Sequence, residues 1–388
     1  MSAEGNLAPG YDAIVVGARC AGAATAMLLA RRGARVLMID GADRGTGTIS
    51  THALMQGAVM QLSSWGLLER IRGAATPAIR TTAFIYGGEV VEQDIEASHG
   101  VDALYAPRRY LLDSVLVDAA IEAGADVRFG ISCRGLLHGP DGRVRGILAG
   151  AADGATFSMP AGIVIGADGR RSSVARFACA ATERQSRNVT AITYGYFEGM
   201  PGNGYRWHYA PSLAAGAVPT NDGKTCVFAA MPRELYLSTV RGHLEVGPYM
   251  MMSFFPELRK SLASARLTGR PIGFIGQKGY MRQAAGAGWA LVGDAGCFMD
   301  PLTAQGITGA LRDAEILARA FTTGSGDLTD YHKTRNALSV DLFELTDLIA
   351  SLSWTMDELK VLHKRLNRAM KEEQDWMATA FKPDPCLA

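Results

Sequence analysis

The chain has 388 residues, of which 48% are hydrophobic and 20% charged, and its formal net charge is +1. This composition is typical of a globular protein large enough for more than one domain, and the near-neutral charge gives no electrostatic reason to expect nucleic acid as a partner. The six cysteines occur singly, which argues against a zinc site or a disulfide framework. No run is long and apolar enough to span a membrane. We therefore expect a cytoplasmic protein that binds no metal.

The N-terminal region has the pattern of a dinucleotide-binding βαβ unit. The β-branched run Ile14-Val15-Val16 predicts a buried strand. A turn at Gly17 follows, then a helix of small residues from about Cys20 to Arg32. A second apolar run predicts another strand, which ends at Asp40. In such units the acid after the second strand accepts hydrogen bonds from a ribose.

The turn between the first strand and the helix departs from the usual fingerprint at one position. Gly17 allows the sharp turn, and Gly22 allows the helix to pack closely on the sheet. Arg19 stands where the fingerprint has its second glycine. Its guanidinium would reach a bound pyrophosphate, cap the adjoining loop, or lie on the surface of a slightly wider turn. The helix N-terminus, with Cys20 and Ala21, would offer N–H groups to the pyrophosphate.

The next part of the chain alternates between helical and strand patterns. The sequence predicts, in order, a polar loop, a helix, a pair of strands and a second helix, at about residues 43–52, 53–72, 81–96 and 107–123. Two strands then surround a turn at Gly139–Gly142, and a buried strand from Ala161 ends in the turn Asp168-Gly169.

From about Thr190 to Gly279 aromatic residues and methionines become frequent, and alternating segments predict antiparallel strands. The pattern of the N-terminal part, an apolar strand followed by a turn with an acid, returns in a strand that ends at Gly293-Asp294. A helix follows from about Thr303 to Thr322. The tail from about Asp327 to Phe381 is predicted to be helical. Its apolar patches could cover a substrate cavity, form a homodimer contact or complete the core, and the pattern alone leaves all three open.

Three strand-end motifs now stand in one order: the Gly17 turn, Asp168-Gly169, and Gly293-Asp294 with the segment Asp300–Ile307 after it. In this set and order the chain resembles the FAD-dependent monooxygenases of the p-hydroxybenzoate hydroxylase fold, with the related geranylgeranyl reductases and flavin-dependent halogenases. The resemblance spans roughly residues 10–320. It implies an α/β fold with a Rossmann-like FAD-binding domain, an inserted, mostly antiparallel β-sheet substrate domain and C-terminal helices.

The resemblance also divides the chain into parts. The FAD-binding domain is expected to be discontinuous and to comprise residues 10–80, 105–180 and 282–325. The substrate-binding sheet would comprise residues 81–104 and 185–281, and residues 326–388 would form a C-terminal helical segment.

The family's cofactor contacts can be carried over to matching positions. Its first motif holds the ADP half of FAD, and the aspartate that matches Asp294 bonds the ribityl chain. The segment after that aspartate places backbone N–H groups near the flavin pyrimidine edge, and a helix start that matches Arg109 faces the cofactor. The cofactor-binding residues predicted in this way are Gly17, Arg19, Cys20, Ala21, Gly22, Asp40, Arg109, Asp168, Gly293, Asp294, Pro301, Gln305, Gly306 and Ile307.

Candidates for the substrate side lie on one predicted strand and one loop. Tyr205, Trp207 and Tyr209 would form an apolar substrate wall or simply pack for burial, and Tyr205-x-Trp207 resembles the core of the prenyl reductase motif. His52, Tyr205 and His208 are the polar candidates for handling a proton. His52 lies where the family's second loop runs toward the isoalloxazine, and is otherwise a helix-start residue.

The resemblance leaves more than one reaction open. A hydroxylase reduces FAD with NAD(P)H and then forms a flavin C4a-hydroperoxide with O2, and the lack of a second βαβ fingerprint suits a nicotinamide that binds only transiently. We therefore expect an NAD(P)H- and O2-dependent monooxygenase that hydroxylates an apolar or aromatic small molecule. Reduction of a prenyl double bond is the alternative, because Tyr205-x-Trp207 and the segment around Asp300 fit that branch. Halogenation is disfavoured because no lysine precedes Lys224. A flavin-binding protein without turnover is disfavoured by the large aromatic domain.

Overall fold

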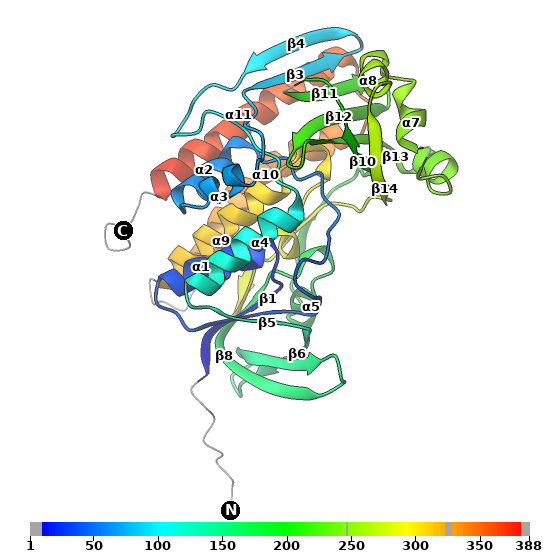
Figure 1. The fold of residues 1–388 in the computed structure, drawn as a ribbon. Coiled ribbons are helices and arrows are strands. Elements are labelled where there is room, and N and C mark those ends of the chain that lie inside the picture. Colours follow the sequence, from blue (N-terminus) through cyan, green and yellow to red (C-terminus); the bar gives the residue numbers. More distant parts are fainter. Residues whose placement is uncertain (1–9, 203, 246, 323–327, 382–388) are drawn as a thin grey trace, which may run out of the picture.

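The computed structural model describes residues 10–202, 204–245, 247–322 and 328–381. These residues form an α/β fold in which two β-sheets lie toward opposite ends of the molecule, with a group of helices between them (Figure 1). One sheet is largely parallel and contains the N-terminal βαβ unit, and the other is mostly antiparallel. The predicted fold class is confirmed.

The first sheet has eight strands in the order β16-β17-β8-β1-β2-β5, with β7 beside β8 and β6 beside β7. Strand β1 runs parallel to both β2 and β8. The strands of this sheet are β1 (Tyr11–Val16), β2 (Val36–Asp40), β5 (Asp126–Phe129), β6 (Ile131–His138), β7 (Val144–Ala151), β8 (Thr156–Gly166), β16 (Ala285–Gly286) and β17 (Trp289–Leu291).

Strand β1 is apolar on both sides because both faces of the sheet are covered. Ala13 and Val15 pack into a core shared with the central helices, whereas Ile14 and Val16 pack against residues of β6, β7 and the helix after β8. Side chains of successive strand residues point to opposite faces, so a strand buried on both sides reads as a continuous apolar run.

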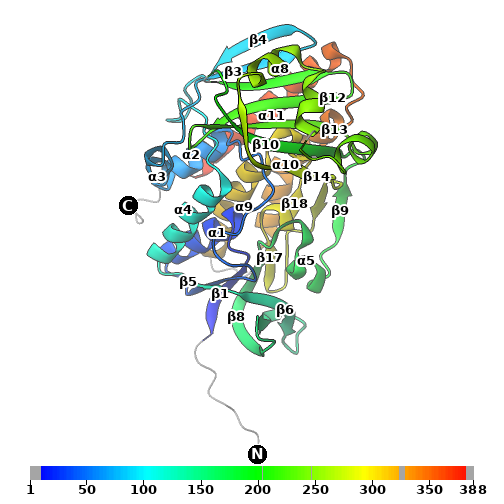
Figure 2. The ribbon, with the colours of Figure 1, turned by 45° about the vertical axis from the view of Figure 1, so that its right-hand side comes forward.

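The longer helices lie on one face of this sheet and against the second sheet (Figure 2). The helices are α1 (Cys20–Arg31), α2 (Gln56–Ser64), α3 (Leu68–Gly73), α4 (Arg109–Glu122), α5 (Ser173–Phe177), α6 (Arg233–Leu235), α7 (Gly247–Met252), α8 (Pro256–Leu262), α9 (Gly306–Thr322), α10 (Thr329–Ala350) and α11 (Met356–Ala380). Short helices of other types are η1 (Gly169–Arg171), η2 (Tyr236–Val240), η3 (Gly293–Ala295) and η4 (Pro301–Thr303).

The single helix predicted over residues 53–72 is wrong, because the structure has α2 and α3 in its place. Gly66 has a φ of 76°, a left-handed conformation that ends α2. The N–H of Leu67 donates to the carbonyl of Leu62 at 2.8 Å, which is the backbone bond expected when a glycine closes a helix.

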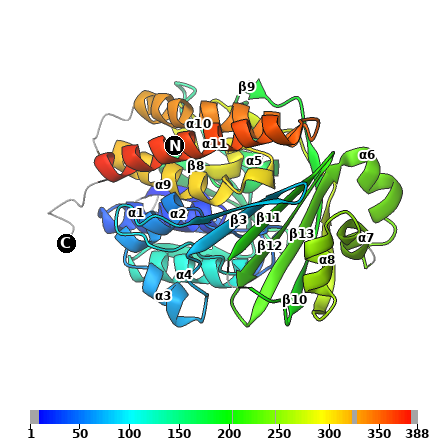
Figure 3. The same cartoon turned by 90° about the horizontal axis from the view of Figure 1, so that it is seen from above.

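The second sheet has seven strands in the order β14-β10-β13-β12-β11-β3-β4. Helices α10 and α11 pass over one of its faces, and α6, α7 and α8 lie on the other side (Figure 3). Its strands are β3 (Thr81–Tyr86), β4 (Glu89–Asp94), β10 (Thr190–Glu198), β11 (Tyr205–Ala210), β12 (Leu213–Thr220), β13 (Lys224–Pro232) and β14 (Arg266–Phe274).

Each face of this sheet has its own apolar core. Tyr194 and Trp207 pack with residues of α10 and α11, whereas Phe197 and Met231 pack with residues of α7 and α8. The sequence did not predict the helices between β13 and β14. A third, small sheet joins β9 (Thr182–Gln185), β15 (Tyr280–Arg282) and β18 (Cys297–Phe298). Within the described ranges, no helix has the length and apolar character needed to cross a bilayer.

Candidate functional site

The glycine turn after β1 brings three backbone segments into close contact. Gly17 has a φ of 108°, and a Cβ atom there would lie 2.5 Å from the carbonyl oxygen of Ala167 at the end of β8. A Cβ atom on Gly22 would lie only 1.8 Å from the carbonyl oxygen of Gly17. Both positions therefore require glycine, and α1 starts directly against the turn.

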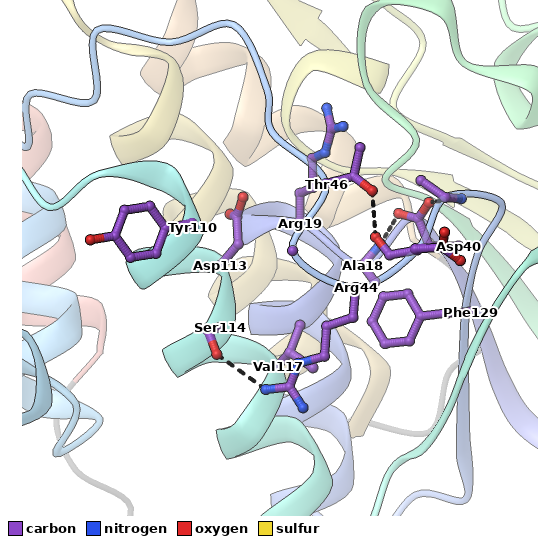
Figure 4. Close-up of a pocket in the computed structure, with 13 residues that line it drawn as sticks. Ala18, Arg19, Asp40, Arg44, Thr46, Tyr110, Asp113, Ser114, Val117 and Phe129 are labelled. Carbon is purple, nitrogen blue, oxygen red and sulfur yellow. Dashed lines mark hydrogen bonds between the residues drawn. The ribbon is translucent and has the colours of Figure 1, made fainter. Parts of the chain in front are cut away.

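The residues just before α1, Ala18 and Arg19, line a cavity beside β2. Arg19 precedes the helix and makes no side-chain cap, and the N–H of Cys20 donates to Asp113 at 3.1 Å. A cavity of about 190 Å³ opens here (Figure 4). Its lining residues are Ala18, Arg19, Asp40, Ala42, Asp43, Arg44, Gly45, Thr46, Tyr110, Asp113, Ser114, Val117 and Phe129.

Asp40 lies in this cavity with its carboxylate fixed by backbone groups. One oxygen accepts the N–H of Ala18 at 2.8 Å, and the other accepts the N–H of Ala42 at 2.9 Å. A carboxylate oxygen can accept two hydrogen bonds, so each oxygen keeps capacity for a ligand hydroxyl. Asp40 is thus placed as the sequence predicts for an acid that binds a ribose.

Arg19 binds the loop that follows β2. Its guanidinium donates to the hydroxyl of Thr48 at 2.7 Å and to the carbonyl of Gly47 at 3.4 Å. Of the three roles that the sequence left open, this geometry matches the one in which Arg19 caps the adjoining loop. Arg19 also lines the cavity, so a contact with a phosphate there stays a prediction.

Asp168 follows β8, and its carboxylate binds the turn that it starts. One oxygen accepts the hydroxyl of Ser172 at 2.5 Å, and the other accepts the N–H and hydroxyl of Ser173 at 2.6 and 2.7 Å and the N–H of Val174 at 3.3 Å. The second oxygen is thus saturated, whereas the first accepts a single hydrogen bond. The geometry assigns Asp168 to holding the start of α5, and its direct contact with the cofactor stays a prediction.

Asp294 follows β17 and has the opposite character. Its carboxylate receives no hydrogen bond from any residue in the described ranges. Burial raises its pKa to about 6, against the lowering effect of Arg170 and Arg109. A Cβ atom on Gly306, the first residue of α9, would lie 3.9 Å from one of its oxygens. Asp294 is therefore an acceptor without a donor, beside a helix N-terminus.

The segment between Asp294 and α9 is held in an unusual conformation. Asp300 accepts the N–H of Leu302 at 3.1 Å and so caps η4, and Ala304 has a left-handed φ of 56°. Such a conformation costs a non-glycine residue on the order of 1–3 kcal/mol and is often found at functional sites. The buried side chain of Gln305 turns back to the carbonyl of Thr303 at 3.0 Å. The backbone contacts with the cofactor predicted for Pro301 to Ile307 stay a prediction.

Arg109 links the start of α4 to the start of α1. Its guanidinium donates to Asp113 at 2.8 Å and lies 3.6 Å from the sulfur of Cys20. It also lowers the pKa of Asp294, which places its charge within electrostatic range of that carboxylate. Arg109 is thus close to both halves of the candidate site.

The three aromatic residues of β11 face the central helices but are covered. Tyr205, Trp207 and Tyr209 are only 1%, 9% and 6% exposed. The Trp207 indole donates to the hydroxyl of Thr82 at 3.2 Å, and Tyr209 packs edge-on against Trp354 before α11. Their packing matches the burial reading that the sequence left open. A substrate contact by Tyr205, Trp207 or Tyr209 stays a prediction.

His208 lies on the other face of the same strand. Its ring packs 5.8 Å from Phe255, which belongs to the core under α7 and α8. Strand residues alternate between faces, so His208 cannot share a site with Trp207. The structure thus places His208 on the face away from Trp207, and its predicted role in handling a proton stays a prediction.

His52 lies at the predicted place, after the loop that Arg19 binds. Its side chain is 2% exposed, and both ring nitrogens are engaged, with the carbonyl of Ala106 and the hydroxyl of Tyr196. Burial lowers the pKa of His52 to about 3. A histidine with this pKa is neutral near pH 7 and is a weak base, so the geometry argues against the predicted role in proton transfer.

Comparison with known proteins identifies the group that this site holds. Residues 10–196 match a family model described as FAD binding domain. The matched segment includes the Gly17 turn and Asp40, and the chain is an FAD-dependent oxidoreductase.

Similar proteins carry out different reactions. Menaquinone reductase of Mycolicibacterium smegmatis is 27% identical over 348 residues, which cover 82% of this flavoprotein and 78% of the relative. Aklavinone 12-hydroxylase DnrF of Streptomyces peucetius is 30% identical over 203 residues, 48% of this chain and 39% of the relative. Among solved structures, the myxobacterial chondrochloren halogenase CndH superimposes with a TM-score of 0.78 at 20% identity, covering 97% of this chain and 99% of that one. At this sequence identity, the similarity to the halogenase shows a shared fold only.

The residues of this flavoprotein fit FAD. Asp294 offers a half-buried acceptor that receives no hydrogen bond from the described residues, and the ribityl chain of FAD is rich in hydroxyl donors. Gly17 and Gly22 leave no room for a Cβ atom at the turn that would approach the pyrophosphate. The cavity beside Asp40 is suited to the adenosine end. When bound, the flavin supplies the redox chemistry, and the protein supplies position and the exclusion of water.

Two residues near the sheet face were missed by the sequence analysis. Tyr196 binds His52, and the alternation Tyr194-Gly-Tyr196 in a strand was a signal that could have found it. His363 of α11 lies 2.8 Å from the hydroxyl of Tyr86 and 4.8 Å from the ring of Tyr209. No local pattern indicates that second contact, because it joins the tail of the chain to a distant sheet.

Proposed function

We propose that this flavoprotein is an NAD(P)H- and O2-dependent monooxygenase that hydroxylates an apolar or aromatic small molecule. One observation carries the proposal: a single apolar cluster joins the sheet to the cofactor segment. Tyr194 and Phe228 of the sheet belong to it, together with Leu302 from the segment after Asp294. A substrate bound there would lie against the flavin site in a dry environment.

Water exclusion matters more for this reaction than for most. Oxygen activated by a reduced flavin is lost to water unless the site is closed. The sheet face is covered by α10 and α11, whose residues Leu345 and Leu359 are part of the same cluster. In this proposal the C-terminal helices close the substrate side of the site, and NAD(P)H visits the flavin only to reduce it.

Reduction of a carbon–carbon double bond is the second candidate. The observation in its favour is the extent of the similarity to relatives. The menaquinone reductase matches 82% of the chain, whereas the hydroxylase match covers 48%. A match of the larger extent must include part of the region beyond the flavin-binding segments. A prenylated quinone or lipid would also suit an apolar cluster.

One experiment separates the two reactions. The FAD-loaded protein is incubated with NADPH or NADH and with two probes, 1-naphthol and a menaquinone with an unsaturated side chain. We expect substrate-stimulated O2 uptake and a naphthol product that gains one 18O atom from 18O2. A menaquinone product that gains two hydrogen atoms in its side chain under argon, as opposed to its quinone ring, without oxygen uptake on naphthol, would establish the reductase instead.

A further inference from the structure

The backbone turn that carries Asp294 is held on both sides by buried side chains of α10. The hydroxyl of Tyr331 donates to the carbonyl oxygen of Leu291, before the turn, at 2.5 Å. The guanidinium of Arg335 donates to the carbonyl oxygen of Gly296, after the turn, at 3.0 Å. Tyr331 and Arg335 lie one helical turn apart, and both are fully buried. Helix α10 thus fixes the chain on either side of Asp294.

Helix α9 supplies a third contact with the same turn. The N–H of Gly293 donates to the carboxylate of Asp313 at 3.3 Å. Arg312 donates to Asp313 at 2.8 Å and also to Glu373 of α11, and all three charged side chains are buried. A continuous set of ion pairs therefore connects α11 to the turn through α9.

Arg335 differs from Arg312 because it has no acidic partner. Its side chain is 0% exposed, and within the described ranges it forms no ion pair and its Nε atom has no hydrogen-bond partner. Its guanidinium is held instead by two carbonyl oxygens, one of Gly296 and one of Arg282 in β15. Burial of a cation is costly, and apolar side chains in place of buried charges are often neutral or stabilising. Completion of the core alone therefore does not explain an arginine at this position.

The turn needs support because it keeps the Asp294 carboxylate partly away from water. The turn lies closely between two helices, since a Cβ atom on Gly293 would lie 3.0 Å from the side chain of Ala21 in α1 and 3.2 Å from that of Ala310 in α9. Burial also disfavours the ionised form of Asp294, whose pKa is raised to about 6. A turn free to move would carry this carboxylate toward water, where its charge is better solvated. Contacts on both sides of the turn oppose that movement.

We propose that Arg335 and Tyr331 are positioning residues for the cofactor. They hold the turn from Gly293 to Gly296 so that the Asp294 carboxylate stays where it can accept hydrogen bonds from the ribityl hydroxyls of FAD. The sequence left open whether the C-terminal helices cover a cavity, form a dimer contact or complete the core, and this inference gives α10 a further role in cofactor binding. It rests on the contact between Asp294 and FAD and not on the reaction that follows.

A double-mutant cycle on FAD affinity tests the proposal without turnover. FAD is removed, and its rebinding to the folded protein is followed by the change in flavin fluorescence. Arg335→Met removes both carbonyl contacts and should weaken FAD binding about tenfold. In the Asp294→Asn background the same substitution should weaken binding by no more than about threefold, because the ionised acceptor that the turn presents is already gone.

Two further variants separate positioning from a simple loss of stability. Tyr331→Phe removes one hydroxyl and keeps the packing of the ring, so it should fold and weaken FAD binding roughly threefold, again only when Asp294 is present. Arg335→Lys keeps a cation that can donate to the same carbonyls, and should recover most of the affinity that Arg335→Met loses. Urea denaturation of each variant confirms that the protein is folded under the conditions of the titration.

Arg32→Met is the matched control. The side chain of Arg32 is only 10% exposed, and it donates to Glu315 at 2.8 Å and to the carbonyl of Leu28 at 3.2 Å. Neither partner belongs to the turn that carries Asp294. This variant should lose stability in urea, and its FAD affinity should stay within about twofold of that of the unchanged protein.

Three results would overturn the proposal. Retained FAD affinity in folded Arg335→Met would show that the turn needs no support from α10. An equal loss of affinity with and without Asp294→Asn would show a general structural effect instead of positioning. An unchanged FAD affinity in Asp294→Asn alone would remove the contact on which the inference rests.

Discussion

Asp168 and Asp294 occupy equivalent places in the two halves of the cofactor domain, yet their carboxylates are in opposite states. Each follows a strand of the same sheet and precedes a helix. Asp168 accepts hydrogen bonds from Ser172, Ser173 and Val174. Asp294 receives none from the described residues, and its pKa is raised to about 6 by burial.

The difference separates a residue that builds the fold from one that awaits a ligand. Asp294 is half-buried, and a carboxylate that receives no hydrogen bond from the protein takes its donors from water or from a ligand. A saturated carboxylate has no such need. Whether the protein itself uses the hydrogen-bonding capacity of a polar group is therefore a better guide to the site than the position of that group in a motif.

The largest expected effect comes from Asp294→Asn. Hydrogen bonds to a charged group contribute about 1.5–3 kcal/mol, so FAD affinity should fall roughly 10- to 100-fold. The affinity of the unchanged protein should rise with pH through about 6, because FAD hydroxyls bind the ionised Asp294, and the variant should show no such rise. Fluorescence titration of FAD at pH 5 and pH 7.5 measures both effects.

The FAD-free protein should respond to the same substitution in the other direction. The pKa of Asp294 rises from 3.8 to about 6 on folding, so the protonated form is favoured in the fold. Its contribution to stability is complete below pH 3.8 and is lost as pH rises through 6, at a cost of about 1–3 kcal/mol. Asp294→Asn should therefore raise the melting temperature of the FAD-free protein at pH 7.5. A lower melting temperature would break the comparison.

Asp168→Asn should reverse this pattern. Asparagine keeps one acceptor oxygen but places an amide against the donors of Ser172 or Ser173, so we expect a loss of about 1–2 kcal/mol in unfolding free energy. FAD affinity of the folded protein should stay within about threefold. Urea denaturation and FAD titration give the two values. A loss of affinity as large as that of Asp294→Asn would show that Asp168 touches the cofactor after all.

Much of the cofactor half could be predicted because its signals are local. A strand, Gly17, a helix and Asp40 lie within one short stretch, and the backbone contacts of Gly17 and Gly22 explain why the pattern is so specific. The sequence analysis did not predict that Asp168 also holds the start of α5, although Ser172 and Ser173 follow it closely and an acid before serines is a helix-start pattern.

The substrate half was harder because its contacts are distant along the chain. The alternation of β11 predicted that Trp207 and His208 point apart, but not which core each would enter. That depends on α10 and α11 covering one face and α7 and α8 the other, which no local pattern encodes. The pairing of His52 with Tyr196 likewise joins residues 144 positions apart.

Substitution of His208 has the smallest expected effect. It is also the strictest test of the idea that a polar group without hydrogen-bond partners marks a ligand site. The Nε2 atom of His208 is buried and has no hydrogen-bond partner among the residues that the structure describes, as in a ligand site, yet it lies on the face away from the predicted cofactor site. The adjoining cavity of about 10 Å³ has room for roughly one water, which would satisfy a neutral ring but not a carboxylate. We therefore expect His208→Leu to leave FAD affinity and turnover within about twofold.

Acid stability distinguishes this explanation from a functional one. Burial lowers the pKa of His208 from 6.5 to about 4, so its contribution to stability is complete above pH 6.5 and is lost as pH falls toward 4. His208→Leu should remove that loss and raise the melting temperature at pH 5 relative to pH 7.5. If turnover instead fell by tenfold with the fold intact, the far face of the sheet would carry function. His208 would then be interpreted, like Asp294, as a residue that binds a ligand.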